Sequence, residues 1–389
     1  MYSHLAVLMS LFSLMEVCFI GLCIGYLLMI GTLLYGWRLV TRKRIAPLFI
    51  DKSPSVSLVI PFRNEASNLP QMMRQVNTGI PASWEVVWVD DHSEDGSISV
   101  LRDYLEKHQP IGWRVVKNEG IGKKRALYVG IATARNEVIV TTDADILFHG
   151  NPFLFLVREL VNPEVHMVIG PVFSESTSGF FSDFQQVEWA SIQIVTGVSC
   201  QAGAPLMCSG ANLCFRRSSF FAVGGYDGNY THPSGDDEFL LKKVVAKFGA
   251  GAVAYFHGGE GLVYAKPFEK WEALIGQRRR WVSKWRVHRS AVHGLSSLIS
   301  FLLPAFFVLS PLLLVTGAIS LLVFGFGWFC KALADWLALR QVIRHFGLVL
   351  KSTSVILSAF VHPLFVVAVG VGVARGKYTW KGRKSDLFF

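Results

Sequence analysis

Charged residues are scarce in this chain of 389 residues: only 17% are Asp, Glu, Lys or Arg, whereas 51% are hydrophobic. A chain with so little charge and so many apolar residues is neither intrinsically disordered nor a small disulfide scaffold. Its length is sufficient for one or two domains with cores of their own. The excess of apolar residues also argues against an ordinary soluble enzyme.

Acidic residues are nearly absent from the two ends of the chain. Residues 273–389 contain fifteen Lys and Arg but two acids, and residues 1–44 contain four against one. Residues 45–272 have the opposite balance, with nineteen basic and twenty-five acidic side chains. The formal net charge of +10 therefore belongs to the apolar ends, which indicates a border with membrane lipids. A nucleic-acid-binding protein would carry its basic surface on the polar domain, so we expect no nucleic-acid partner.

An uncharged run of 21 residues, 17–37, lies near the N-terminus. At about 1.5 Å per residue, a helix of this length crosses a hydrocarbon core of roughly 30 Å. Arg38, Arg42, Lys43 and Arg44 follow at once, and the positive-inside rule then predicts a cytoplasmic location for the polar middle of the chain. Because the basic residues follow the apolar run, a signal peptide is excluded. We expect an integral protein of the inner or plasma membrane.

The C-terminal apolar sequence is less regular. Residues 295–339 are interrupted by charge only at Lys331 and Asp335, which predicts two spans joined by a tight turn, and residues 352–374 form a third apolar run. Three full crossings would put the basic tail, 375–389, outside the cell, against the positive-inside rule. We therefore expect two or three membrane segments, one of them re-entrant or interfacial.

Several motifs with well-defined chemistry are missing. The six cysteines form no CxxC pair, so free thiols are expected and a zinc site is not. Neither GxSxG nor HExxH occurs. Residues 120–124 lack the spacing and the hydroxyl residue of a Walker phosphate-binding loop. His257 stands alone, and a lone histidine is more often structural than a metal ligand.

The polar middle alternates short apolar strands with amphipathic helices. This pattern predicts an α/β domain with a mostly parallel sheet and helices on both faces. Ligands bind such sheets beyond the carboxyl ends of the strands. The expected strands are 55–61, 84–89, 113–117 and 137–141, and the expected helices are 68–76, 97–108, 123–134 and 239–248.

Two acidic motifs directly follow predicted strands. Asp90 and Asp91 can accept hydrogen bonds from a base or a ribose, although acids at this position also cap helices. Asp143 and Asp145 can hold a divalent cation, Mg²⁺ or Mn²⁺, together with a diphosphate, because hard cations prefer oxygen ligands. The alternative for this second motif is a simple turn.

Two further motifs occur on predicted helices. The acids of Gly-Asp-Asp-Glu at 235–238 either cap a helix or supply a general base that removes a proton from an attacking hydroxyl. Gln-Arg-Arg-Arg-Trp at 277–281 is followed by more basic and aromatic residues up to 289. This segment can lie on an anionic membrane surface, or contact a diphosphate and stack on a sugar or base, and one helix can do both.

Six motifs in this order, between membrane segments, resemble the family 2 glycosyltransferases with a GT-A fold. The resemblance covers about residues 55–281 and is closest to the membrane branch that includes cellulose, chitin and hyaluronan synthases and bacterial lipid or polysaccharide glycosyltransferases. The motifs are Val-Ile-Pro-Phe-Arg-Asn-Glu at 59–65, Val-Asp-Asp-His-Ser at 89–93, Gly-Lys-Lys-Arg-Ala-Leu at 122–127, Thr-Asp-Ala-Asp at 142–145, Gly-Asp-Asp-Glu at 235–238 and Gln-Arg-Arg-Arg-Trp at 277–281.

The resemblance implies a role for each matched position. Asp143 and Asp145 would bind the metal, and Asp237 would be the general base, with Asp236 where the family usually has Glu. Cys208, Ser209 and Gly210 would line the acceptor side. The donor would contact Pro61, Arg63, Glu65, Asp90, Asp91, Lys123, Asp143, Gln277, Arg280 and Trp281.

The expected activity is inverting transfer of a sugar from a nucleoside-diphosphate sugar, with UDP-sugar favoured, to a lipid or lipid-linked saccharide in the membrane. Two alternatives stay open: a processive polysaccharide synthase with export, and a non-catalytic membrane scaffold. The expected domains are an N-terminal anchor (1–45), a GT-A domain (46–276), a basic interface helix (277–294) and a C-terminal membrane region with its tail (295–389).

Overall fold

The computed structural model describes residues 2–43, 55–230, 232, 234–283, 291–374, 377–380 and 383–386. Its strands are β1 (Val56–Phe62), β2 (Glu85–Asp90), β3 (Trp113–Lys117), β4 (Val138–Thr141), β5 (Ile146–Leu147), β6 (Met167–Ile169), β7 (Val172–Ser174), β8 (Leu213–Arg216), β9 (Val253–Tyr255), β10 (Val263–Ala265), β11 (Lys377–Trp380) and β12 (Arg383–Asp386). Its helices are α1 (Tyr2–Arg42), α2 (Leu69–Gly79), α3 (Ser97–His108), α4 (Lys123–Thr133), α5 (Phe153–Glu159), α6 (Phe180–Gln201), α7 (Arg217–Ala222), α8 (Asp236–Phe248), α9 (Trp271–Ser283), α10 (Ala291–Val315), α11 (Leu321–His345) and α12 (Ser352–Ala374).

The central sheet has seven strands in the order β3-β2-β1-β4-β8-β6-β9. The strands from β3 to β4 are parallel, with Phe62 of β1 opposite Asp90 of β2. Their carboxyl ends and the loops that follow therefore meet at one edge. β8 runs antiparallel to both β4 and β6. Every residue of β1 and β2 is buried, as expected for parallel strands covered by helices on both faces.

The strands and helices expected in the polar middle are confirmed to within three residues at each end. The largest differences lie at α2, which extends to Gly79, and at α8, which begins at Asp236. In α8 the acids of the Gly-Asp-Asp-Glu motif form the first helical turn, where negative charge favours the helix dipole. The second sheet, in the order β5-β10-β7, and the long helix α6 had no expected counterpart.

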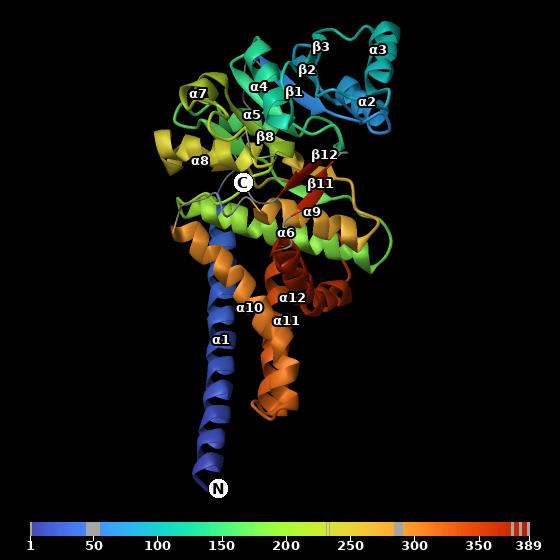
Figure 1. Ribbon diagram of the computed structural model, residues 1–389. Coiled ribbons are helices and arrows are strands. Elements are labelled where there is room, and N and C mark those ends of the chain that lie inside the picture. The colour runs from blue at the N-terminus through green and yellow to red at the C-terminus, as the bar shows by residue number, and fades with distance from the viewer. Residues whose placement is uncertain are drawn as a thin grey trace.

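Helices α6 and α9 lie as a layer between the sheet domain and the membrane helices (Figure 1). A buried ion pair joins them, because the guanidinium of Arg278 on α9 donates two hydrogen bonds, of 2.6 and 2.8 Å, to the carboxylate of Glu188 on α6. Neither side chain is more than 8% exposed. Removing one member of such a pair leaves an uncompensated buried charge, so the two helices are firmly coupled.

Within the part of the chain that the structure describes, four helices are long and apolar enough to cross a membrane. Of these, α1, α10 and α11 extend away from the sheet domain on one side (Figure 1). At the far end of the bundle the Glu16 carboxylate accepts hydrogen bonds from the Ser320 backbone N–H and hydroxyl, at 3.0 and 2.5 Å. The candidate spans are Leu14–Arg42, Leu298–Val315, Leu321–His345 and Ser352–Val373.

The last of these helices, α12, lies along the layer formed by α6 and α9. At its start the Ser354 hydroxyl donates to the Asp183 carboxylate of α6 at 2.5 Å, and near its end Gly372 faces the side chain of Arg279 on α9. Both ends therefore lie on the side of the sheet domain, where β11 and β12 also lie (Figure 1). The expectation of one re-entrant or interfacial segment stays a prediction, because α12 is also long and apolar enough to cross a membrane. The middle of α12 contacts the layer through a cluster of Phe184, Leu274, Phe365 and Val369.

Some expectations fall outside the described residues. They concern Arg44 and the boundary at residue 45, the basic stretch 284–289 that follows the Gln-Arg-Arg-Arg-Trp motif, and Arg375 and Lys381 of the tail.

A buried ion pair stands within the membrane helices. The Lys331 ammonium lies 2.6 Å from the Asp335 carboxylate, one turn along α11, and donates a second hydrogen bond, of 2.9 Å, to the Ala359 carbonyl of α12. The Tyr26 hydroxyl of α1 donates to the same Asp335 carboxylate. Three helices therefore meet at one charge pair, in surroundings where an unpaired charge is costly.

We expect Lys331→Met to lower the free energy of unfolding by about 3–5 kcal/mol, because Asp335 would be left buried without its counter-charge. The double variant Lys331→Met/Asp335→Leu should recover most of this loss. Thermal unfolding in one detergent measures both, with Lys351→Met at an exposed lysine as the matched control. A single variant as stable as the parent would show that the pair does not hold the helices together.

Candidate active site

The main cavity, of about 170 Å³, lies beyond the carboxyl ends of β1, β2 and β4. It is closed on the other side by the beginning of α8 and by α9. Fourteen of the residues expected at the site line it, although they come from seven separate segments of the chain. They are Pro61, Arg63, Glu65, Asp91, Lys123, Asp143, Asp145, Ser209, Gly210, Asp236, Asp237, Gln277, Arg280 and Trp281.

The Arg63 side chain organises the loop after β2. Its guanidinium donates to the backbone carbonyls of Asp91, at 2.9 Å, and of His92, and reaches the Glu94 carboxylate at 3.2 Å. Arg63 is only 8% exposed. The buried guanidinium therefore fixes the backbone that carries Asp91 into the cavity wall.

Asp91 in turn positions the start of α4. Its carboxylate accepts hydrogen bonds from the Asn118 amide at 2.7 Å and from the Gly122 backbone N–H at 2.9 Å. Gly122 directly precedes Lys123, the first residue of α4. The loop contacts thus set the position from which the Lys123 side chain enters the cavity.

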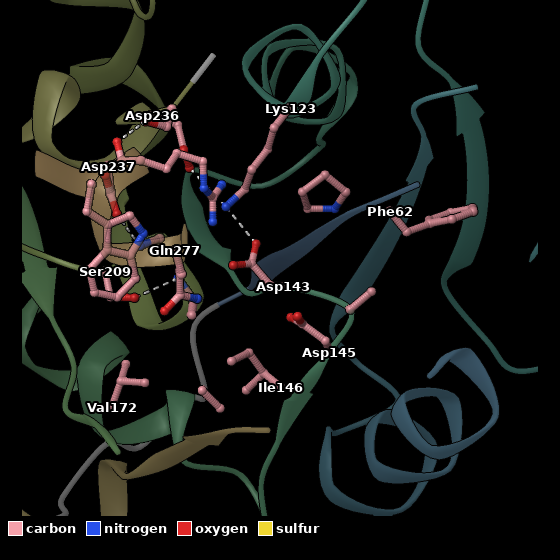
Figure 2. Close-up of a pocket in the computed structure, with 18 of the residues that line it drawn as sticks. Phe62, Lys123, Asp143, Asp145, Ile146, Val172, Ser209, Asp236, Asp237 and Gln277 are labelled. Atoms are coloured by element: carbon pink, nitrogen blue, oxygen red, sulfur yellow. Dashed lines mark hydrogen bonds and ion pairs between the residues drawn. The ribbon is translucent and has the colours of Figure 1, made fainter. Parts of the chain in front are cut away.

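Lys123 bridges the two acidic sides of the cavity, as Figure 2 shows. Its ammonium lies 2.7 Å from the Asp143 carboxylate, after β4, and 3.2 Å from the Asp236 carboxylate at the start of α8. Burial alone would lower the pKa of Lys123, but Asp143 and Asp236 raise it well above its ordinary value. The group is therefore a permanent cation that offsets the charge of both carboxylates.

Asp145 opens into the cavity beside Asp143 (Figure 2). Desolvation by the surrounding protein atoms, and then the negative charge of Asp143, raise the pKa of its carboxyl to about 6. Two carboxylates that repel each other in this way gain stability when a cation lies between them. Within the ranges that the structure describes, no group of three His, Cys, Asp or Glu side chains could hold a metal by itself.

Asp237 faces a second cavity as well as the main one. Its carboxylate accepts hydrogen bonds from the backbone N–H groups of Gly210, at 3.1 Å, and of Glu238, at 2.7 Å. The side cavity, of about 250 Å³, lies between α6, α9 and the segment 207–209, and has a mostly apolar lining. Asp237 borders both cavities, whereas its neighbour Asp236 borders only the main cavity.

Two tryptophans enclose the Arg278 guanidinium on the layer of α6 and α9. The guanidinium carbon lies 4.1 Å from the ring centre of Trp281 and 5.4 Å from that of Trp189. The two rings meet edge to face, with centres 5.7 Å apart. Both tryptophans border the main and the side cavity. Sequence reasoning missed Trp189, and the one available signal was an acid, Glu188, beside it in an apolar stretch.

Two other predicted residues, Asp90 and Cys208, lie elsewhere, and so does the lone His257. The Asp90 carboxylate does not line the main cavity and instead accepts a hydrogen bond from the Ser93 backbone N–H at 3.0 Å, in the loop before α3; it caps no helix, because α3 begins at Ser97 after Gly96. Cys208 lines the side cavity only. His257 lies outside both cavities, with its ring 5.5 Å from that of His345 and bonded to the Lys43 carbonyl at 3.2 Å.

The fold is that of GT-A enzymes. Over 93% of this chain and 99% of the other, it superimposes with a TM-score of 0.65 on a mannosyltransferase from Pyrobaculum calidifontis, solved in complex with GDP-Man and Mn²⁺, at 18% sequence identity. The expected α/β fold class with flanking apolar helices is therefore confirmed.

Residues 57–223 match the family described as glycosyl transferase family 2. This match lies within the segment whose motifs resemble that family. It is 29% identical over 173 residues, 43% of the chain and 49% of the relative, to an undecaprenyl-phosphate 4-deoxy-4-formamido-L-arabinose transferase of Pseudomonas fluorescens. It is 29% identical over 123 residues, 31% of the chain and 36% of the relative, to a dodecaprenyl-phosphate galacturonate synthase of Rhizobium johnstonii. The chain spans about half the length, or less, of these curated relatives.

Gly210→Ala tests how tightly the acids are held. A Cβ at this position would lie 2.9 Å from the Asp236 carboxylate and 3.6 Å from the Lys123 ammonium, so the ion pair must shift. Because small displacements of groups in an active site are costly, we expect glycosyltransferase activity to fall about tenfold. Gly276→Ala is the matched control, since its Cβ meets open space. Unchanged activity of Gly210→Ala would mean that the two groups adapt freely.

Proposed function

We propose that the protein is a membrane-bound, metal-dependent inverting glycosyltransferase. It moves a sugar from a nucleoside-diphosphate sugar, with UDP-sugars the first donors to test, to a lipid phosphate or lipid-linked saccharide. The observation that carries the proposal is the position of Asp237 between the charged main cavity and the mostly apolar side cavity. A carboxylate there can accept a proton from an acceptor group in the side cavity while that group attacks the sugar carbon held in the main cavity.

The donor would bind in the main cavity. Pro61, Glu65 and Asp91 line the end near β1 and β2, which suits the base and ribose, because the carboxyl ends of parallel strands are where such sheets bind nucleotides. Lys123 and Arg280 would face the diphosphate. As the bond between sugar and diphosphate breaks, negative charge builds up on the leaving oxygen, and these fixed cations stabilise it.

The oxygen ligands that the protein offers in the main cavity fit a divalent cation. Asp143 and Asp145 supply two hard oxygen ligands, and among the described residues no third His, Cys, Asp or Glu completes a metal-binding group with them, which leaves positions for the diphosphate oxygens and water. A bound Mg²⁺ or Mn²⁺ would neutralise charge on the leaving diphosphate. Lys123, which already neutralises Asp143, limits how much negative charge remains for that cation.

The acceptor would enter through the side cavity. Its apolar lining, next to the membrane helices, suits a lipid, and Cys208 and Ser209 border it near Asp237. The names of the relatives support this choice, since both refer to isoprenyl phosphates. Arg278 also borders this cavity, but the Glu188 carboxylate already compensates its charge.

The proton balance depends on the acceptor group. A sugar hydroxyl loses its proton to the Asp237 carboxylate as its oxygen attacks the anomeric carbon, and the protonated acid later releases that proton to water. A phosphate monoester has a second pKa of about 6, so near neutral pH it arrives largely without the proton. In both cases attack opposite the leaving diphosphate inverts the anomeric configuration.

We expect Asp237→Asn to lower the rate of transfer to a hydroxyl acceptor by about 10²–10⁴-fold, the usual contribution of a general base. When a lipid phosphate is the acceptor, the loss of transfer rate in Asp237→Asn should become smaller as the pH rises above about 6, because the phosphate then loses its proton without a base. Release of the nucleoside diphosphate from purified protein measures the rate. An equal or larger loss in Asp236→Asn, with Asp237→Asn near the parent, would reverse the assignment.

Removing divalent cations with a chelator should abolish transfer, and added Mn²⁺ or Mg²⁺ should restore it. Asp145→Asn should raise the cation concentration needed for half-maximal activity by about tenfold or more, because one of two oxygen ligands is weakened. Asp103→Asn, at an exposed acid on α3, is the matched control. Full activity in the presence of chelator would contradict the proposed metal dependence.

A further inference from the structure

A third cavity, of about 180 Å³, lies among the membrane helices beneath α6. This membrane cavity has walls from α1, α10, α11 and α12 and a roof from α6. Its lining is mostly apolar and includes Ile30, Leu303 and Leu339 from three different helices. An unfilled apolar cavity lowers stability in proportion to its volume, so a cavity of this size in a membrane is expected to be filled by lipid.

The walls of the membrane cavity are held in place by the ion pair within the bundle. Lys331 and Asp335 border the cavity, and so does Tyr26, whose hydroxyl donates to Asp335. The bond from the Lys331 ammonium to the Ala359 carbonyl brings in α12. The charges therefore compensate each other, and three walls are fixed before any ligand arrives. A preformed, mostly apolar site suits an apolar ligand.

Glu188 lies between the membrane cavity and the side cavity. It lines both of them, and its ion pair with Arg278 holds it there. Asp237 and Trp281 border both the side cavity and the main cavity. The three cavities are therefore neighbours, in the order membrane cavity, side cavity, main cavity. A lipid whose headgroup lies beside Asp237 would have the first part of its chain next to the membrane cavity.

We propose that the membrane cavity binds the hydrocarbon chain of the lipid acceptor, in the stretch next to the headgroup. The proposal rests on the proposed function, because it takes the acceptor to be a lipid. The volume is below the roughly 300–1,000 Å³ of sites for drug-sized ligands, so it holds a short stretch of one chain. A single-chain isoprenyl lipid fits this space better than a phospholipid with two chains. The cavity therefore selects acceptors by the shape of the isoprene units next to the headgroup.

Two pairs of variants test the proposal. In each pair the same Leu→Trp substitution is made once at a residue that lines the cavity and once at an exposed residue of the same helix. Leu339→Trp on α11 and Leu303→Trp on α10 fill the cavity from opposite walls. Leu337→Trp and Leu302→Trp, at side chains 47% and 52% exposed on the same helices, are their controls. We expect the filled variants to raise the KM for a long-chain isoprenyl phosphate about tenfold or more, because chain binding is lost. Their KM for the sugar nucleotide and their slow hydrolysis of it without acceptor should stay as in the parent.

A second readout does not depend on activity. An isoprenyl phosphate with a diazirine in the unit next to the phosphate should label residues of α10, α11 or α12 that line the cavity. Leu339→Trp should abolish this labelling and Leu337→Trp should not. Equal acceptor KM in filled and control variants, or labelling confined to the outer helix faces, would overturn the proposal. Labelling by a diazirine phospholipid that isoprenyl phosphate does not displace would assign the cavity to bulk lipid and overturn it too.

The two readouts separate this proposal from the proposed function. If the parent transfers no sugar to any isoprenyl phosphate, the proposed function fails, and the labelling experiment still reports whether the cavity binds an isoprenyl chain. If transfer occurs but the filled variants and their controls behave alike, only the role of the membrane cavity fails.

Discussion

The active site depends on one ammonium group that holds two acidic segments together. Asp143 follows a central strand and Asp236 begins α8, and the negative charges would repel each other across the cavity. Lys123 lies between them, at 2.7 and 3.2 Å. Its place is set from the loop after β2, because the Asp91 carboxylate accepts a hydrogen bond from the Gly122 backbone N–H, which leads into α4. The loop after β2, the loop after β4 and the start of α8 are therefore all held in place around the Lys123 ammonium.

A second charge pair has the same role toward the membrane. Glu188 and Arg278 join α6 to α9, and the guanidinium lies between the rings of Trp189 and Trp281. Those rings form part of the cavity walls, so the helices that contact lipid also shape the place of reaction. The buried pair stabilises less than an apolar contact of equal size would, but it fixes the register of the two helices. The membrane layer and the sheet domain thus function as one unit.

The sequence predicted the sheet and most of the lining residues because parallel strands end at the same edge. It could not separate Asp90 from Asp91. Neighbouring residues at a strand end point to opposite sides, and only the fold decides which one faces the cavity. Trp189 was missed because it reaches the site from α6, a helix far from the acidic motifs in the chain, and its one local signal, the neighbouring acid Glu188, does not reveal such a contact.

The course of α12 was only partly predictable. Its hydropathy is that of a crossing helix, and composition does not distinguish a helix that crosses from one that lies along a layer. The basic tail supplied the missing information, because it required the chain to return to the side of the sheet domain. The contacts of Ser354 with α6 and of Gly372 with α9 agree with that requirement.

The position of α12 also gives the protein a taper. Next to the sheet domain, α12 adds its cross-section to those of α1, α10 and α11, while farther from it, of the described helices, only those three continue (Figure 1). Leu357 and Leu364 of α12 are exposed by 53% and 58%, so this extra helix presents an apolar outer face. The described helix bundle is therefore broader beside the sheet domain than at its far end.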